Sequence, residues 1–407
     1  MRHRTIVENF GYLSALQAFT VLLPLLTIPF LIRVLGADNY GLVAYAMAII
    51  QYFVIIVNFG FNITATRDVS IHRSDPQKLT EIVSSVLSIK VILFLISFVL
   101  LACAVFVIPF LRAHYLLYFF TMSVCLSEVL FPVWYFQGVE RMRYITFINV
   151  ISRTVFAACI FIFIRKPEHY LLVPIFNGTG ALIGGIIALW IVFRNEKVHF
   201  AFQPMATLWF FIKDSAPLFL TRASAQVYVR TNIVVVGSVL GMAEAAYYDL
   251  ALKVVNVLSM PFQTIKTAIF PKVSKDLNLG FVHKTIKVVL GLAVLGILFV
   301  QLFATPVMKL FLGEPSETAG IVLRLLSLTL AAIVMSGFFG EQLLIPFGHK
   351  KPYVRGMVST ALFYFIVLSA LYLLNLLNLY SVVLMVVATE YFLAAYFFVV
   401  SRKNKLL

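Results

Sequence analysis

Charged residues are scarce in this 407-residue sequence. Asp, Glu, Lys and Arg make up only 12% of the chain, against about 25% in soluble domains. Acidic residues are the rarer kind, with 17 Asp and Glu beside 32 Lys and Arg. Hydrophobic residues make up 62% of the sequence and the mean hydropathy is +0.99. A water-soluble fold cannot bury this much apolar surface, so the composition indicates a membrane protein.

Cysteine is almost absent, and the sequence lacks the common cofactor motifs. The three cysteines, Cys103, Cys125 and Cys159, lie in apolar runs without paired spacing or a nearby histidine, which argues against a disulfide or a metal site. No GxxxxGK[ST] motif occurs, so we expect no direct use of ATP and no bound cofactor. The net charge of +15 raises the question of nucleic acid. The basic residues recur between apolar runs, however, and form no single polar domain.

Long apolar runs dominate what is present. A helix needs about 20 apolar residues to cross a bilayer, and helices satisfy their own backbone groups in lipid. The first run is too long for the core of a signal peptide, so we interpret it as a retained span. The sequence therefore predicts an all-α membrane protein with twelve transmembrane helices, at Phe10–Ile32, Tyr40–Phe61, Ile82–Ile108, Leu116–Phe136, Ile145–Ile164, Leu171–Phe193, Ala216–Leu240, Ala245–Phe270, Val288–Met308, Ile321–Ile345, Gly356–Leu374 and Leu379–Val400.

The basic residues between these spans are unevenly distributed. Twenty Lys and Arg fall in one set of alternate loops and termini, and five fall in the other set: Arg33, Arg112, Arg165, Lys166 and Lys309. The positive-inside rule places the richer set in the cytoplasm. Both termini are therefore expected to be cytoplasmic.

The predicted spans divide into two halves. The polar segment 194–215 separates an N-terminal six-helix lobe at 1–193 from a C-terminal six-helix lobe at 216–407. The tripeptide VLG follows the first span of each half, at Val34–Gly36 and Val239–Gly241. This short repeated sequence fits a parallel repeat of the two halves about an axis along the membrane normal. Transporters with such a repeat bind substrate between the two halves. We expect a central cavity there.

Two arginines inside the seventh span raise the main functional question. Arg222, Gln226 and Arg230 are spaced four residues apart in TRASAQVYVR, so a helix places them on one face, with the two arginines about 12 Å apart. A basic residue at a helix centre costs about 2.5–3.5 kcal/mol. Each arginine has an alternative to binding substrate. The side chain of Arg222 could extend to the membrane interface, and that of Arg230 could pair with an acid from another helix.

Basic residues outnumber acids within the spans. Asp249 and Lys253 have the spacing of a local ion pair, or they face the cavity, and Lys266 is expected to reach the interface. The excess of bases predicts an anionic substrate, because arginine binds phosphate bidentately. A phosphorylated substrate is the simplest candidate and a small organic anion the next. The seven in-span bases and four in-span acids are Lys90, Arg153, Arg222, Arg230, Lys253, Lys266 and Arg324, and Glu128, Asp249, Glu341 and Glu390.

Four stretches of the sequence are similar to blocks of one known family of membrane proteins. PFLIRVLGADNYGLVAYAMAI at Pro29–Ile49 is similar to the family block that joins spans one and two. WYFQGVERMRYITFINVISR at Trp134–Arg153 is the most specific match. SVLGMAEAAYYDLALKVVNVLSMP at Ser238–Pro261 and FPKVSK at Phe270–Lys275 complete the set. The third block has Ala246 where family members often have glycine. By these four stretches the chain resembles the O-antigen flippases (Wzx type) of the multidrug/oligosaccharidyl-lipid/polysaccharide exporter superfamily.

The resemblance implies a fold and a function. Such proteins flip undecaprenyl-pyrophosphate-linked oligosaccharides from the cytoplasmic to the periplasmic leaflet of the bacterial inner membrane. They do so by alternating access, for the biosynthesis of lipopolysaccharide O-antigen or another surface polysaccharide. Two six-helix lobes form a cavity lined largely by spans one, two, seven and eight. A polysaccharide polymerase and a chain-length regulator would be partners. On this reading the protein is no enzyme.

The same resemblance assigns roles to residues of this chain. The pyrophosphate and the sugar headgroup would be bound by Arg222, Gln226, Arg230 and Lys253, with Asn58, Asn62 and Arg67 toward the cytoplasmic end of the second span and Arg33 at the outer end of the first. The resemblance also implies ion-coupled antiport. A proton or sodium gradient would then act through Asp249, Glu128, Glu341 or Glu390. The FQGVERMR loop is expected to be structural or to gate the cytoplasmic face, with Glu140 and Arg141 in salt bridges.

Three other functions fit parts of the sequence. A multidrug or cation exporter would share the fold but would favour an acidic cavity. An ion-coupled exporter of another anion or a sugar stays open as the alternative. A polysaccharide polymerase usually carries a large outer loop, whereas the outer loops here are short.

Overall fold

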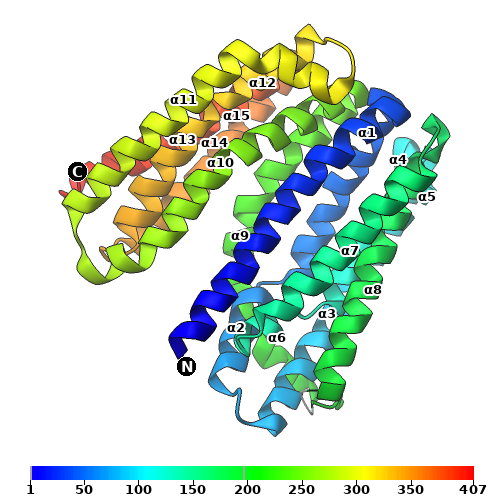
Figure 1. The fold of residues 1–407 in the computed structure, drawn as a ribbon, viewed down its shortest axis with the longest axis vertical. Coiled ribbons are helices and arrows are strands. Elements are labelled where there is room, and N and C mark those ends of the chain that lie inside the picture. Colours follow the sequence, from blue (N-terminus) through cyan, green and yellow to red (C-terminus); the bar gives the residue numbers. More distant parts are fainter. Residues whose placement is uncertain (1, 196–197) are drawn as a thin grey trace. The chain divides into compact units, whose positions relative to one another are not determined.

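The computed structural model describes residues 2–195 and 198–407 (Figure 1). Within these ranges, the side chains of residues 2–10, 13–15, 18, 195, 221, 222, 224, 225 and 228 lie outside the description. All regular elements in the described ranges are helices, as the apolar runs predict. Nine of these helices are long and apolar enough to cross a membrane.

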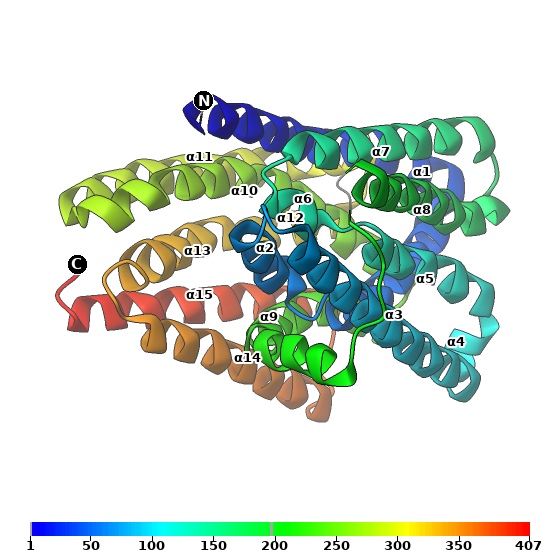
Figure 2. The ribbon, with the colours of Figure 1, turned by 90° about the horizontal axis from the view of Figure 1, so that it is seen from below.

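The chain forms two compact units, Met1–Gln226 and Val227–Leu407, which are described separately. The first unit contains α1 (Arg2–Asn58), α2 (Phe61–Ile71), α3 (Pro76–Val107), α4 (Pro109–Ala113), α5 (Tyr115–Leu130), α6 (Val133–Gly138), α7 (Met142–Phe163), η1 (Pro167–Leu171), α8 (Leu172–Asn195) and the first part of α9 (Met205–Val239). Within it, α8 packs along both α5 and α7, and α1 packs against the same two helices α5 and α7 (Figures 1 and 2).

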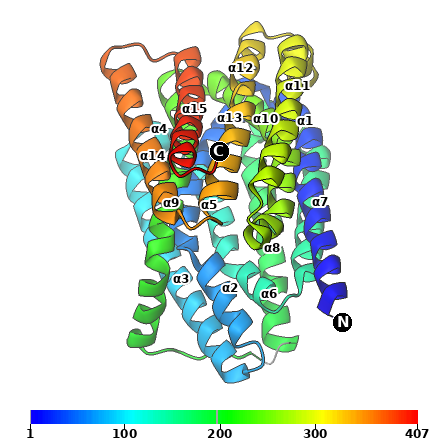
Figure 3. The same cartoon turned by 90° about the vertical axis from the view of Figure 1, so that its left-hand side faces the viewer.

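The second unit contains the end of α9, then α10 (Met242–Asp276), α11 (Leu279–Leu312), α12 (Glu317–Ser327), α13 (Thr329–Ser336), the π-helix η2 (Gly337–Leu344), α14 (Lys350–Leu373) and α15 (Leu379–Lys403). Here α15 packs against α13 and α14, and α12 packs against α10 and α11 (Figure 3). A π-helix is rare and often marks a functional site.

The helices follow the predicted apolar runs with one merger. α1 passes through the first two predicted spans, and Gly36 interrupts it with a φ of +79°, a conformation that glycine adopts without strain. α9 and α10 carry the seventh and eighth predicted spans. Of α9, the described stretch Val229–Val239 is an apolar helix, and α10 is not among the nine helices that are apolar enough. The charged side chains of Asp249, Lys253 and Lys266 lower the hydropathy of α10. The count of twelve spans and the cytoplasmic termini stay predictions.

The outer faces of several helices are apolar. On α3, Phe106 and Val107 are 70% and 78% exposed, and on α11 Leu302 is 72% exposed. An extended apolar surface of this kind is rare on water-soluble monomers. Contact with lipid explains it, in agreement with the composition.

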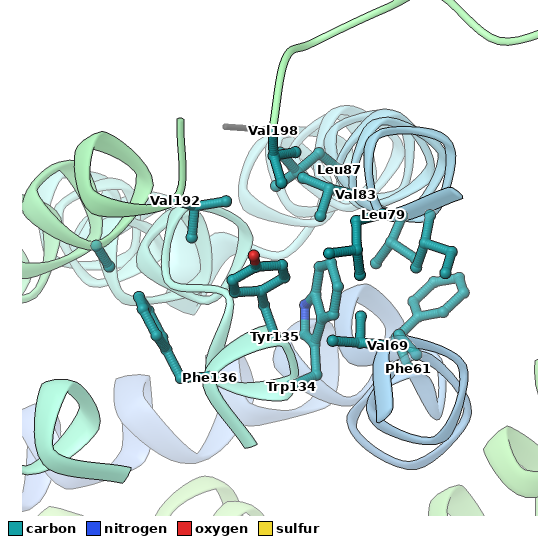
Figure 4. Close-up of a cluster of buried hydrophobic side chains, with 14 of the residues drawn as sticks. Phe61, Val69, Leu79, Val83, Leu87, Trp134, Tyr135, Phe136, Val192 and Val198 are labelled. Carbon is teal, nitrogen blue, oxygen red and sulfur yellow. The ribbon is translucent and has the colours of Figure 1, made fainter. Parts of the chain in front are cut away.

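The FQG segment owes its composition to packing. Trp134, Tyr135 and Phe136 on α6 are almost fully buried, and they lie in an apolar cluster with Phe61 and Val69 of α2 (Figure 4). A Cβ atom at Gly138 would stand 2.6 Å from the Cβ of Val69 and 2.9 Å from the carbonyl oxygen of Thr66. Glycine is therefore required for α6 to approach α2 this closely. The packing of α6 on α2 accounts for the composition of this segment.

The loop after this segment carries ion pairs at the same end of the first unit. Arg73 lies 3.5 Å from Glu140, so one of the expected salt bridges forms. Arg141 makes further contacts. Glu140 has a φ of +60°, which is uncommon for a residue other than glycine.

The polar segment between the predicted lobes is folded onto the first unit. Val198, Leu208 and Phe211 are buried, and Ser84 of α3 donates to the backbone oxygen of His199 and accepts from the backbone N–H of Ala201. Gly60, with a φ of +83°, allows close approach of α9, since a Cβ there would stand 3.2 Å from the backbone oxygen of Ser215. The boundary between the compact units lies further along, inside α9. The predicted division at 194–215 stays untested.

Candidate functional site

The predicted polar stripe lies on α9. This helix is continuous from Met205 to Val239, so Arg222, Gln226 and Arg230 have the spacing that places them along one helix face. Gln226 is exposed and Arg230 is half-buried, whereas the side chain of Arg222 lies outside the described residues. Among the residues that the structure describes, Arg230 forms no ion pair.

Lys253 and Asp249 form the local ion pair that their spacing permits. The Lys253 ammonium lies 2.5 Å from the Asp249 carboxylate on α10. Asp249 is buried, and both residues make further contacts. The positive charge of Lys253 is thus largely balanced within its own helix. The structure favours the structural alternative for this pair.

The other predicted binding residues of the first unit are dispersed. Arg67 is exposed and forms ion pairs with Asp68 at 2.7 Å and Asp214 at 2.9 Å. Asn62 is half-buried on α2, one turn before Thr66, whose hydroxyl donates to the Asn62 backbone oxygen. Arg33 is exposed and engaged in a contact of its own. Arg67 is thus paired with two carboxylates of its own unit, and its role in binding substrate stays a prediction.

Asn58 and Glu128, predicted for different roles, contact each other. The Asn58 side-chain N–H donates to the Glu128 carboxylate at 3.2 Å. Lys90, 1% exposed, donates to the backbone oxygen of Glu128 at 2.7 Å. Three helices, α1, α3 and α5, therefore meet in one polar cluster. Asn58 thus has a partner within the unit, which weakens its assignment to a substrate headgroup.

Glu341 and Glu390 line one cavity of the second unit. This cavity has a volume of about 230 Å³, and the Glu341 carboxylate within it lies 2.8 Å from the Lys266 ammonium. Lys266 therefore pairs with an acid on the π-helix, and its reach to the membrane interface stays a prediction. Glu390, on α15, makes no hydrogen bond within the described part of the chain.

A second polar cavity lies inside the first unit. Its volume is about 390 Å³, and α1, α5, α7 and α8 all contribute to its wall. Of the residues in this wall, Glu128 is a predicted coupling residue, whereas the amide side chains have no predicted role. The available signal was the recurrence of amides in apolar runs, at Gln51, Asn149 and Asn177.

Three of the four acids inside the helices are already engaged. Asp249 pairs with Lys253, Glu341 pairs with Lys266, and Glu128 accepts from Asn58. The anion site on α9 and the coupling of an ion through these acids stay predictions.

Three comparisons place this geometry among known proteins. Residues 6–276 match the family described as "Polysaccharide biosynthesis protein". The chain is 26% identical to a protein of Escherichia coli (strain K12) over 98% of its own length and 97% of that protein, and 24% identical to one of Shigella dysenteriae over 88% and 92%. Both are named "Putative O-antigen transporter".

Solved structures with the same fold are transporters. A multidrug resistance MATE family transporter of the MOP superfamily, in an inward-facing conformation, superposes with a TM-score of 0.72 at 14% identity, with 94% of each chain covered. A MOP superfamily transporter from Pyrococcus furiosus reaches 0.64 at 14% identity, covering 98% of this chain and 95% of that one. At this identity the likeness defines the fold: a helical, multi-pass membrane protein.

Proposed function

Because the chain belongs to the polysaccharide biosynthesis protein family, we propose that it carries undecaprenyl-pyrophosphate-linked oligosaccharides across the bacterial cytoplasmic membrane. The units would move from the cytoplasmic to the periplasmic leaflet for assembly of an O-antigen-like surface polysaccharide. The observation that carries the proposal is the match to O-antigen transporters over nearly the whole chain. The protein is a transporter rather than an enzyme.

The diphosphate is proposed to bind at the α9 face. Arg222 and Arg230 stand about 12 Å apart along the helix, with Gln226 between them. Guanidinium groups hold phosphate oxygens through parallel hydrogen bonds, which are strong where water is scarce. The excess of basic over acidic residues within the predicted spans, seven against four, supports this role, because it leaves positive charge for an anionic ligand. The polyprenyl chain would stay in lipid.

Alternating access is the proposed cycle. The site would face the cytoplasm to accept the headgroup and then the periplasm to release it. This requires that substrate bind the two states differently, since a ligand shifts an equilibrium only by its differential affinity. A polysaccharide polymerase and a chain-length regulator would act on the delivered units.

A proton or sodium gradient is proposed to drive the cycle. Of the four candidate acids, Glu390 lines a cavity beside the Lys266–Glu341 pair and is the one without a hydrogen-bond partner among the described residues. Glu390 is therefore the acid that we expect to bind the coupling ion, with Glu341, Glu128 and Asp249 as the further candidates.

The test is a binding measurement on the purified protein. Native mass spectrometry would compare undecaprenyl-pyrophosphate-linked glycan on the wild type, Arg222→Gln, Arg230→Gln and the double variant. We expect a loss of about 10- to 150-fold for each single change, corresponding to the ~1.5–3 kcal/mol of a charged hydrogen bond. Thr264→Val on α10, whose hydroxyl donates within its own helix, is the control. Folded arginine variants that bind like the wild type would refute this site.

A further inference from the structure

The cavity inside the first unit gathers polar side chains where they are expensive. Its wall includes Gln51 of α1, Asn149 and Arg153 of α7, and Asn177 of α8, together with Glu128 of α5. Polar groups within membrane helices are costly and usually serve a function. Four helices each place a polar side chain at the same cavity. The packing of any one helix does not explain why these groups gather there.

Close packing of two helices builds one side of this wall. A Cβ atom at Gly184 of α8 would stand 2.6 Å from the Ser152 hydroxyl oxygen, and one at Gly180 would stand 3.0 Å from the Ser152 backbone oxygen. Small residues allow membrane helices to approach closely. The glycines of α8 therefore hold the Ser152–Arg153 segment of α7 at the cavity.

Much of the hydrogen-bonding capacity of this wall is unused by the protein. The Asn149 side-chain N–H donates to the Ile145 backbone oxygen at 2.8 Å, which leaves its other N–H and much of its oxygen's capacity unused. Over the part of the chain that the structure describes, Gln51, Asn177 and Arg153 donate no hydrogen bond. A ligand in the cavity would meet both donors and acceptors from several directions.

The charges around the cavity nearly balance. Arg153 and Glu128 both line it and interact electrostatically. Lys90 lies behind Glu128, where it is bound to that residue's backbone oxygen. A simple anion would meet the Glu128 carboxylate, and an apolar compound would leave the amides without partners, which costs free energy. The wall suits a neutral, hydroxyl-rich ligand.

The size and the apolar part of the wall agree with that class. The volume of about 390 Å³ lies at the lower end of the ~300–1,000 Å³ that is typical of ligand sites. Phe131 and Phe156 contribute aromatic surface beside the amides. A sugar ring offers apolar C–H faces to such surface and hydroxyl groups to the amides.

We infer that this cavity binds a neutral sugar residue of the transported glycan, separately from the diphosphate at the α9 face. The inference rests on the proposed function, because it names where that substrate's sugar would be recognised. It assigns Gln51, Asn149 and Asn177 to sugar recognition, with Arg153 and Glu128 fixing its orientation.

The experiment compares two lipids that differ only in the glycan. One probe is the lipid-linked oligosaccharide fraction from a source strain that lacks this gene, and the other is undecaprenyl pyrophosphate without sugar. Native mass spectrometry would give the ratio of their affinities for wild type, Gln51→Met, Asn149→Leu and Asn177→Leu. These three changes lie on three helices, and each keeps side-chain size while it removes the amide. Thr121→Val is the matched control, since Thr121 is buried in the same unit and bonds within its own helix.

We expect the wild type to bind the glycan-linked lipid more tightly than undecaprenyl pyrophosphate. In each amide variant, the ratio of the two affinities should fall about tenfold. Binding of undecaprenyl pyrophosphate, and all binding by Thr121→Val, should stay unchanged. Folded variants that keep the full preference would overturn the sugar site and leave the flippase proposal intact. The same holds if the wild type binds both lipids equally. A wild type that binds neither lipid would overturn both proposals.

Discussion

Replacement of Gly138 by alanine should destabilise the protein by forcing α6 away from α2. The added Cβ would stand 2.6 Å from the Cβ and Cγ1 of Val69 and 2.9 Å from the Thr66 backbone oxygen. Carbon atoms prefer a separation of about 3.5–4.0 Å, so α6 and α2 must separate by roughly 1 Å. Overpacking of this kind costs about 1–3 kcal/mol. Alanine recovers at most ~1 kcal/mol by restricting the unfolded chain, which leaves a net loss of about 1–2 kcal/mol.

The measurement is thermal unfolding in detergent, followed by tryptophan fluorescence. Trp134 is 1% exposed beside this contact, so its emission should report the loss of packing. Gly291→Ala is the control, because nothing lies within 4 Å of the atom added there. We expect Gly138→Ala to unfold at a lower temperature than wild type, and Gly291→Ala to unfold at the same or a higher temperature.

A second substitution makes this prediction sharper. Val69→Ala removes the Cγ1 atom that would meet the new methyl group at 2.6 Å. The double variant should therefore lose less stability than the two single losses added together. The contacts with the Cβ of residue 69 and with the Thr66 oxygen remain, so the rescue should be partial. If Gly138→Ala unfolds like Gly291→Ala, or if the two losses simply add, the packing argument is refuted.

Three further predictions concern the intramembrane charges. Lys266→Met should lower the unfolding temperature more than the double change Lys266→Met with Glu341→Leu, because the single change leaves a carboxylate without its partner; equal effects would contradict the pairing. Lys90→Met should cost about 1–3 kcal/mol in denaturant unfolding, because the Glu128 backbone oxygen loses its buried donor, and an unchanged midpoint would show that the bond is dispensable. Glu390→Gln should abolish the gradient dependence of transport in proteoliposomes and leave glycan binding unchanged; transport that still follows the gradient would exclude Glu390 as the coupling acid.

Local features were predictable from the sequence. The apolar runs predict the helices, since length and hydropathy are properties of contiguous residues. The spacing of Asp249 and Lys253 predicts an ion pair within one helix, which forms. The family resemblance, which rests on contiguous motifs such as WYFQGVERMR, is confirmed by the family match over residues 6–276.

Contacts between helices were not predictable in the same way. Lys266 lies near a span end, which suggested an interfacial position, yet it pairs with Glu341, 75 residues further along the chain. Asn58 donates to Glu128 from another helix, and the first unit's cavity requires four helices at once. Such arrangements depend on helix rotation and packing, which the periodicity of a single helix does not determine. The roles assigned to Arg222, Gln226, Arg230, Asn62 and Arg33 stay predictions.

The most direct test of the central claim is a transport measurement. The purified protein would be reconstituted into liposomes that contain undecaprenyl-pyrophosphate-linked oligosaccharide in both leaflets, under an imposed proton or sodium gradient. A glycosidase that cannot cross the membrane would then be added outside, and the cleaved fraction measured. The account predicts that wild-type protein exposes the inner-leaflet glycan to cleavage, whereas the Arg222→Gln, Arg230→Gln double variant does not. If cleavage in the presence of folded wild-type protein stops at the fraction of glycan in the outer leaflet, the protein does not flip this lipid.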